Sequence, residues 1–200
     1  MEIIYFKEIE STQKYLLDHL IENICIWSEY QTKGIGSRGN SWVGEKGNLF
    51  FSFSLNKNDL PKDLKLQSIS IYYMFLLKEV LNGYGSKVKF KWPNDLYLDK
   101  KVGGCISNLK NDIIIVGIGL NTKSSIDFNA LDIKIENETI LYDFLGLVNK
   151  NISWSDVYKK LEKEFYANKF IMSNNLDLSK AKLNFDGSIE LNNERIYSLR

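Results

Sequence analysis

The residues with the most evident chemistry lie in one stretch, from Lys91 to Ile106. An amide and a carboxylate, Asn94 and Asp95, follow a proline, and Lys101 comes just before a Gly-Gly pair. A fixed ammonium group stabilises negative charge that builds up in a reaction, and glycine lets a ligand lie against bare backbone. The stretch therefore predicts a reaction centre, with Lys101 among its candidate side chains. The other interpretation is a solvated lysine in an ordinary turn.

A glycine-rich loop is the second candidate. Residues 32–48 contain five glycines in seventeen positions, between two predicted strands. Loops of this length are uncommon in compact domains and usually bind or cover a ligand. Glycine amides can line a phosphate or carboxylate, Arg38 can add charge, and Trp42 can stack on a planar ring. A flexible connector with a core tryptophan is the alternative.

Two hydroxyl groups, on Ser11 and Thr12, stand where a helix is expected to begin. Apolar residues follow them at helical spacing. Such hydroxyls either cap the helix or hold the polar end of a ligand at its N-terminus. The sequence leaves both roles open.

Composition argues against several other classes of protein. The 26 Lys and Arg residues balance 25 Asp and Glu, so no net field recruits nucleic acid. Cys25 and Cys105 stand far apart and His19 is the single histidine, which disfavours disulfides, zinc and Ser-His or Cys-His catalysis. Because no signal region or run of 18 apolar residues is present, we expect a cytoplasmic protein without a membrane segment.

Strands and helices are expected to alternate around these residues. Strands are predicted at 3–6, 25–31, 49–55, 88–92, 102–109 and 113–119, and helices after Thr12 and at 61–81, 138–148 and 155–171. The tail changes to short strands joined by the turn dipeptides Asp186-Gly187 and Asn192-Asn193. Since two or three strands cannot stand alone, a main α+β domain (1–174) should carry a small β domain (175–200).

Four motifs together resemble the biotin protein ligases. They are Gln31 with the loop Gly34–Trp42, Lys91-Trp92-Pro93-Asn94-Asp95, Lys101-Val102-Gly103-Gly104, and Gly117-Ile118-Gly119-Leu120-Asn121. The Lys-Trp-Pro-Asn-Asp run followed by Lys-x-x-Gly is specific to that family. The resemblance implies a mixed sheet backed by helices, as in class II synthetases and biotin and lipoate ligases, with a shortened SH3-like C-terminal domain. It leaves no room for a winged helix, so we expect no binding to operator DNA.

The resemblance also implies an activity. Such enzymes join biotin to ATP as biotinyl-5'-adenylate, with Mg²⁺ that travels with ATP, and then biotinylate one lysine of a biotin carboxyl carrier protein. For catalysis the resemblance implies Lys101, Arg38 and Asp95. The residues that it implies around biotin are Ser11, Thr12, Gln13, Gln31, Gly34, Ile35, Gly36, Ser37, Lys101 and Gly104. Those that it implies around the adenylate are Arg38, Trp42, Asn94, Lys101 and Asn121. No metal ligand is assigned. Asp95 has two open roles: positioning the metal or the acceptor lysine, and clamping the backbone of its turn.

The glycine-rich loop departs from the family pattern. That pattern typically reads Gly-Arg-Gly-Arg, whereas Ile35 and Ser37 stand at the two arginine positions here, with Arg38 one place along. A serine hydroxyl supplies neither the charge nor the bidentate fork of a guanidinium group. Either Arg38 supplies the missing contact or the adenylate is held more loosely, and we expect weaker retention than in members that have both arginines.

Two other functions stay open at this point. A lipoate or octanoate protein ligase shares the fold, and a non-catalytic biotin- or nucleotide-binding module would suit the loss of the arginines. The Gln31 loop favours biotin, and the presence of Lys101, Asn94 and Asn121 together favours catalysis. The resemblance also allows a homodimer, and Arg200 is a candidate contact to the nucleotide.

Overall fold

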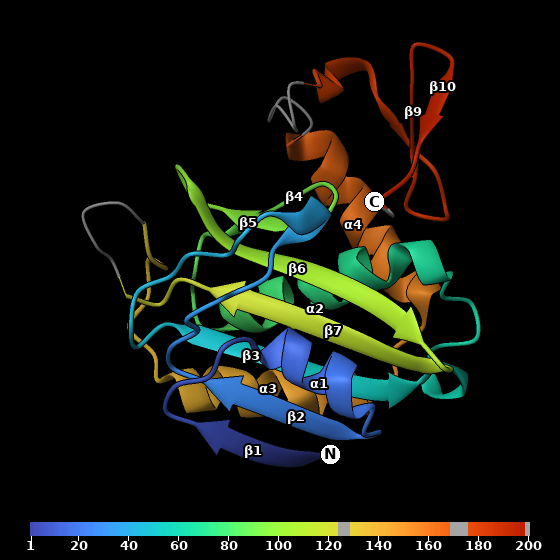
Figure 1. The fold of residues 1–200 in the computed structure, drawn as a ribbon. Coiled ribbons are helices and arrows are strands. Elements are labelled where there is room, and N and C mark those ends of the chain that lie inside the picture. Colours follow the sequence, from blue (N-terminus) through green and yellow to red (C-terminus); the bar gives the residue numbers. More distant parts are fainter. Residues whose placement is uncertain (124–128, 169–175, 199–200) are drawn as a thin grey trace.

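The computed structural model describes residues 1–123, 129–168 and 176–198, and its centre is a seven-stranded sheet (Figure 1). The strand order is β1-β2-β3-β7-β6-β5-β4. β1 (Glu2–Phe6) runs parallel to β2 (Ile24–Ser28), and every other neighbouring pair is antiparallel. The predicted mixed sheet is confirmed. The remaining strands are β3 (Leu49–Asn56), β4 (Lys89–Lys91), β5 (Asp95–Tyr97), β6 (Lys101–Lys110) and β7 (Ile113–Leu120).

Helices cover the two faces of the sheet unequally (Figure 1). α2 (Ile69–Gly83), α3 (Asn137–Asn149) and α4 (Trp154–Asn168) pack with one face and share its large buried cluster. α1 (Thr12–His19) lies on the opposite face over a smaller cluster of Leu16, Ile24, Ile26, Ile113 and Ile115. The face under α1 is therefore only partly covered, which leaves room for a ligand. None of the described helices is long and apolar enough to cross a membrane.

The helix predicted from Pro61 begins later than expected. Turns and a short 3-10 helix occupy the segment before Ile69, and Leu66, an apolar residue of the predicted helix, is exposed. The carboxylate of Asp63 accepts hydrogen bonds from the backbone N–H groups of Trp154 (2.9 Å) and Ser155 (2.8 Å). Because Asp63 satisfies the free amides at the start of α4, its own segment is held as a loop.

A small antiparallel sheet stands where the shortened β domain is predicted. It consists of β8 (Lys182–Leu183), β9 (Ile189–Leu191) and β10 (Glu194–Ile196) in the order β10-β9-β8. The turn between β9 and β10 is Asn192-Asn193, and both residues have the positive φ values (53° and 65°) that suit a tight hairpin. The expected domain boundary at 174/175 and Arg200 lie outside the described residues.

Asp186, in the turn between β8 and β9, should make stability depend on acid. Partial burial acts to raise the pKa of this carboxyl, but hydrogen bonds from Ser188, Arg195 and Gln67 outweigh it and lower the pKa from 3.8 to about 2. A lowered pKa stabilises the folded state above about pH 4, and this contribution is lost as the pH falls towards 2. It amounts to about 2 kcal/mol.

The measurement compares the free energies of unfolding of the wild type and Asp186→Asn from pH 7 to pH 2. The two should differ near neutrality and converge below pH 4. A difference that stays constant over this range would contradict the electrostatic origin.

Candidate active site

At one end, the sheet face beneath α1 consists of glycines and presents backbone without side chains. On β7, Ile113 and Ile115 pack under α1, and the same face continues with Gly117 and Gly119. In the ladder with β6, Gly104 lies opposite Gly119. Two neighbouring strands thus present glycine where a core face would present side chains. These glycines form the floor of a cavity.

Glycine is required in this floor because two side chains lie directly against it. A Cβ atom on Gly117 would lie 2.4 Å from Oε1 of Gln13, and one on Gly119 would lie 2.5 Å from Cε2 of Trp42. Both distances are far below van der Waals contact. Any larger residue must displace the side chain above it.

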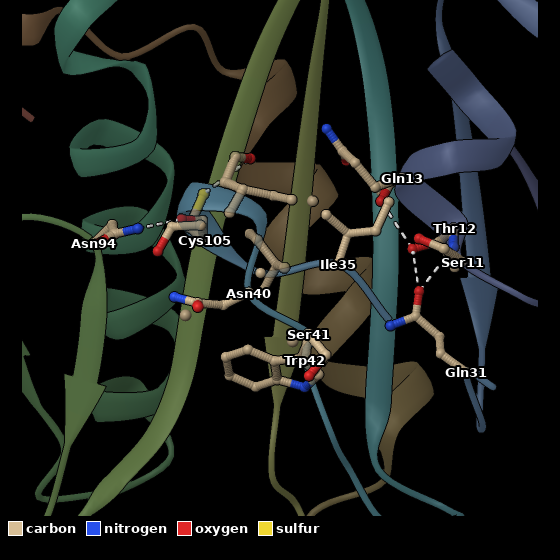
Figure 2. Close-up of a pocket in the computed structure, with 18 of the residues that line it drawn as sticks. Ser11, Thr12, Gln13, Gln31, Ile35, Asn40, Ser41, Trp42, Asn94 and Cys105 are labelled. Carbon is tan, nitrogen blue, oxygen red and sulfur yellow. Dashed lines mark hydrogen bonds between the residues drawn. The ribbon is translucent and has the colours of Figure 1, made fainter. Parts of the chain in front are cut away.

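A cavity of about 240 Å³ lies over the floor (Figure 2). Its walls come from the start of α1, the glycine-rich loop and strands β3, β5, β6 and β7. The structure thereby brings together most residues predicted for the site. These are Ser11, Thr12, Gln13, Gln31, Ile35, Gly36, Ser37, Trp42, Asn94, Asp95, Lys101 and Gly104.

Hydroxyl and amide groups gather at one end of the cavity (Figure 2). Oε1 of Gln31 accepts hydrogen bonds from the backbone N–H (2.7 Å) and the hydroxyl (3.1 Å) of Thr12. The Thr12 hydroxyl also lies 2.8 Å from the hydroxyl of Ser52. Oγ of Ser11 accepts a hydrogen bond from the backbone N–H of Lys14, so Ser11 caps α1. Ser11 thus takes the capping role predicted for it, and both residues line the cavity.

Ser52 was not predicted as a site residue. It lies in the middle of β3, between the buried Phe51 and Phe53, and its register partner on β7 is Gly117. A buried serine between two phenylalanines of a central strand is the signal that would have indicated it.

Two buried polar atoms in the cavity walls have no hydrogen-bond partner among the described residues. They are Oε1 of Gln13 and Nε1 of Trp42. The amide nitrogen of Gln13 is already engaged, since it donates to Oδ1 of Asn108 (2.9 Å) and to the carbonyl of Ile115 (3.3 Å). An unpaired buried polar atom costs roughly 1–3 kcal/mol. A ligand that pairs with these atoms would recover that cost.

A cation and a carboxylate pair in the cavity wall. Nζ of Lys101 lies 2.7 Å from Oδ1 of Asp95 and 5.0 Å from the centroid of the Trp42 ring. Asp95 thus contacts Lys101 itself, an arrangement that neither of its predicted roles describes. The amide of Asn94 donates to the carbonyl of Cys105 at 2.5 Å. The pair thus places an ammonium group and its carboxylate partner in the cavity wall.

A second cavity, of about 480 Å³, shares Asn94, Asp95 and Lys101 with the first. Arg38 lines this second cavity only, and its backbone has a positive φ of 59°. The predicted residues Gly34 and Asn121 line neither of the two cavities.

Gly34 and Asn121 are both buried and make backbone hydrogen bonds close to the cavity walls. Gly34 is buried, and a Cβ there would lie 2.4 Å from the carbonyl oxygen of Trp42. Its own carbonyl accepts a hydrogen bond from the Trp42 N–H at 2.8 Å, which folds the glycine-rich loop back over the floor. Asn121 is buried at the end of β7, where its N–H donates to the carbonyl of Val102.

Nucleophilic cysteine and resident-metal chemistry find no support in the described residues. Burial raises the pKa of the Cys105 thiol well above its usual range, so the group stays protonated at neutral pH. No group of three His, Cys, Asp or Glu side chains in the described ranges could hold a metal ion. Among the residues that the structure describes, Asp95 is the single carboxylate residue lining the first cavity.

Comparison with known proteins gives a consistent match. Residues 5–121 match the model of the biotin/lipoate A/B protein ligase family. The bifunctional ligase/repressor BirA of Escherichia coli K12 is 37% identical over 125 residues, which cover 56% of this chain and 38% of that protein. Biotin–protein ligase 2 of Arabidopsis thaliana is 36% identical over 110 residues, covering 50% and 33%. The chain thus matches about a third of the length of these relatives.

Solved structures match over more of their length. A biotin acetyl coenzyme A carboxylase synthetase from Helicobacter pylori, with bound biotinylated ATP, is 39% identical and superposes with a TM-score of 0.93 over 98% of this chain and 99% of that one. Biotin protein ligase from Aquifex aeolicus, in complex with biotin and ATP, is 28% identical with a TM-score of 0.65, over 84% and 75%. Since the family model spans more than half of the sequence and carries the predicted motifs, the chain belongs to the biotin/lipoate A/B protein ligase family.

Proposed function

We propose that the protein is an ATP-dependent biotin protein ligase. It forms biotinyl-5'-adenylate from biotin and ATP and then transfers the biotinyl group to a lysine of a biotin carboxyl carrier protein. One observation carries the proposal: the Lys101–Asp95 ion pair lies in the wall of a cavity that has a glycine floor and a polar end. The biotin ligases among the relatives and the ligands bound in the two solved structures support it.

The polar end of the cavity suits the ureido ring of biotin. A ureido group offers one carbonyl acceptor and two N–H donors. The hydroxyl of Thr12 already donates to Gln31, so the hydroxyl of Ser52 is the one that can turn to donate to the carbonyl, and the unpaired Oε1 of Gln13 can accept from an N–H group. The dithiolane ring of lipoate has none of these groups. The polar end therefore favours biotin over the lipoate alternative.

Lys101 is the group proposed to act in adenylate formation. When the biotin carboxylate attacks the α-phosphate of ATP, two anions meet and charge builds on the phosphoryl oxygens. The ammonium group of Lys101, held by Asp95, is positioned to stabilise that charge. We propose that Mg²⁺ enters on the ATP phosphates, because the described residues offer no cage of their own.

The glycine-rich loop is proposed to cover the adenylate. The product is a mixed anhydride that water destroys, and a folded loop excludes water from it. The N–H of Gly36 donates to the carbonyl of Asn40 at 2.7 Å, and this tight turn brings Ile35 and Ser37 to the cavity. The ring of Trp42 is proposed to stack on adenine.

Exchange of labelled pyrophosphate into ATP tests the function. The exchange should require biotin, because pyrophosphate leaves ATP when the biotin carboxylate attacks the α-phosphate, and the reverse attack of labelled pyrophosphate on the adenylate returns the label to ATP. If the wild type shows no exchange in the presence of biotin, the proposal that the protein is a biotin protein ligase is wrong. Exchange with lipoate alone would move the protein to the rival ligase, and biotin binding without exchange would make it a binding module.

Restoring an arginine at position 37 should make the adenylate stay longer. Ser37 lines both cavities, and a guanidinium group there adds charge-assisted hydrogen bonds to phosphate. Ser37→Arg should slow release of biotinyl-5'-adenylate about tenfold and reduce labelling of non-specific lysines. The measurements are the adenylate off-rate by rapid dilution and biotin incorporation into a bystander protein.

Thr32→Arg is the matched control for this change. It adds the same charge to the same loop at an exposed residue that lines neither of the two cavities. If both variants slow release equally, the effect is general charge attraction and the specific role of position 37 is wrong.

A further inference from the structure

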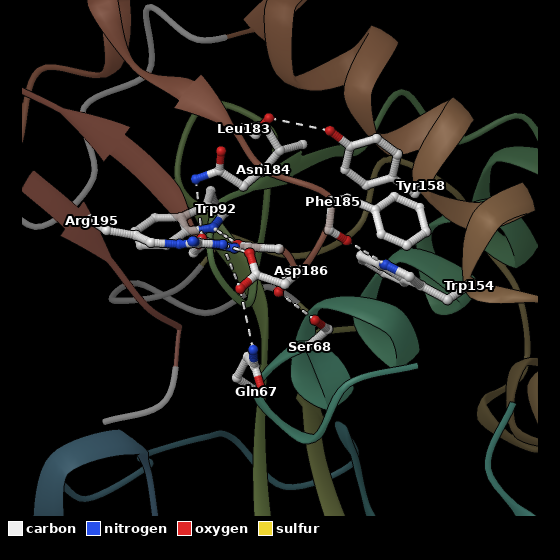
Figure 3. Close-up of polar contacts among 12 residues, drawn as sticks. Gln67, Ser68, Trp92, Trp154, Tyr158, Leu183, Asn184, Phe185, Asp186 and Arg195 are labelled. Atoms are coloured by element: carbon white, nitrogen blue, oxygen red, sulfur yellow. Dashed lines mark hydrogen bonds and ion pairs between the residues drawn. The ribbon is translucent and has the colours of Figure 1, made fainter. Parts of the chain in front are cut away.

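The turn between β8 and β9, residues 184–188, is held to the main domain by two buried tryptophans (Figure 3). Nε1 of Trp154 donates to the carbonyl of Phe185 at 2.6 Å. Nε1 of Trp92 donates to the carbonyl of Gly187 at 2.9 Å. Two indole N–H groups from different parts of the main domain therefore bind the same five-residue turn.

The same turn rests against the start of α2. The hydroxyl of Ser68 donates to the carbonyl of Asp186 at 2.6 Å. Gly187 has a φ of +76°, and a Cβ there would lie 2.8 Å from Cδ1 of Ile71. Only glycine fits such a position without a shift of its neighbours. The turn is thus a closely packed contact between the small sheet and the main domain.

The two tryptophans differ in what surrounds them in the chain. Both are buried, with 2% of Trp92 and 0% of Trp154 exposed. Trp154 begins α4, and neither it nor its sequence neighbours line the two cavities. Trp92 is followed at once by Pro93 and Asn94, which line the second cavity. Only Trp92 lies next to the candidate site.

A short chain of contacts leads from Trp92 to the cation. Asn94 is fixed to Cys105 twice: its carbonyl accepts the Cys105 N–H at 3.0 Å and its side-chain amide donates to the Cys105 carbonyl at 2.5 Å. Asp95 comes next and holds Nζ of Lys101 at 2.7 Å. Trp92 thus begins the short segment whose last residue, Asp95, contacts the ammonium group of Lys101.

We propose that Trp92 is a positioning residue for Lys101. Its hydrogen bond to Gly187 fixes the start of the segment that carries Asn94 and Asp95, and so couples the small C-terminal sheet to the place where phosphate charge is stabilised. The proposal rests on the proposed function, because it assigns Lys101 to adenylate formation. It gives the turn 184–188 a role in catalysis without any contact to substrate.

The test compares Trp92→Phe with Trp154→Phe. Each change removes one indole N–H from a carbonyl of the same turn and puts a smaller ring in a buried site, so both should lower the melting temperature by several degrees. At a temperature where both variants stay folded, Trp92→Phe should reduce kcat for biotin-dependent pyrophosphate exchange about tenfold, because small misplacements of a reacting group are costly. Trp154→Phe should keep kcat within about twofold. The KM for biotin should change little in either.

Hydrogen exchange gives a readout that does not depend on activity. The amide of Cys105 donates to Asn94, so its exchange rate reports how firmly the segment after Trp92 is held. It should exchange faster in Trp92→Phe than in Trp154→Phe. Equal losses of kcat in the two variants, or equal exchange rates, would overturn the proposal. A wild type without pyrophosphate exchange would refute the proposed function instead, and the hydrogen-exchange contrast would then decide the coupling alone.

Discussion

Lys101→Ala should slow biotin-dependent adenylate formation about 10³-fold. The ammonium group is the cation that the structure holds in the cavity wall, 2.7 Å from Asp95, and removing a fixed stabiliser of transition-state charge typically costs two to three powers of ten, about 10²–10³-fold. Biotin binding should weaken much less, since its ring is proposed to lie at the polar end. Pyrophosphate exchange measures the first quantity, and calorimetric titration with biotin measures the second.

Lys100→Ala is the control for charge. Lys100 precedes Lys101 in the sequence, is exposed, and lines neither of the two cavities. Its removal should change the rate no more than about twofold, as expected for a solvated surface charge. Equal losses in the two variants would show that a diffuse field, and not the position of Nζ, supports the reaction.

The parts of the site that lie close together in sequence were predictable. Asn94, Asp95 and Lys101 fall within eight residues, and the loop that carries Trp42 can be recognised in the sequence by its glycine content. Local spacing and the family motif were enough to place them in one cavity. The mixed sheet followed from the same resemblance, because alternating strands and helices of these lengths fit that fold.

The parts that depend on strand register were not predictable. Ser52 enters the site because its partner on β7 is Gly117, and Gly117 faces the cavity because alternate residues of a strand point to opposite faces. A sequence shows the glycine but not which side it faces. The hydrogen bond that Nε1 of Trp92 donates was not predictable either, because its acceptor, the carbonyl of Gly187, is 95 residues away.

Single hydrogen bonds decided other details. Asp63 accepts N–H groups from the first residues of α4, and this contact between distant segments delays the start of α2 to Ile69. Ion pairing likewise gave Asp95 a partner, Lys101, that its sequence position does not reveal. Such contacts depend on the tertiary structure, so propensity alone does not predict them.

Gly117→Ala should weaken biotin binding about 100-fold. The new methyl group would lie 2.4 Å from Oε1 of Gln13 and 3.1 Å from Oγ of Ser52, at the end proposed for the ureido ring. Gln13 cannot retreat easily, because its amide nitrogen is held by Asn108 and by the backbone. Overpacking of this kind costs roughly 1–3 kcal/mol, and the upper end corresponds to about two powers of ten in affinity. Calorimetric titration with biotin measures the change.

Gly103→Ala is the control, because it adds the same methyl group to the opposite face of the neighbouring strand. Its Cβ would lie 3.0 Å from Cδ1 of Leu120 and 3.1 Å from Cε of Met74, in the core beneath α2. It should lower the melting temperature while biotin affinity stays within about threefold, since the strain falls on packing and not on the cavity. Equal losses of affinity in the two variants would mean that the sheet as a whole, and not the glycine floor on one face, determines binding.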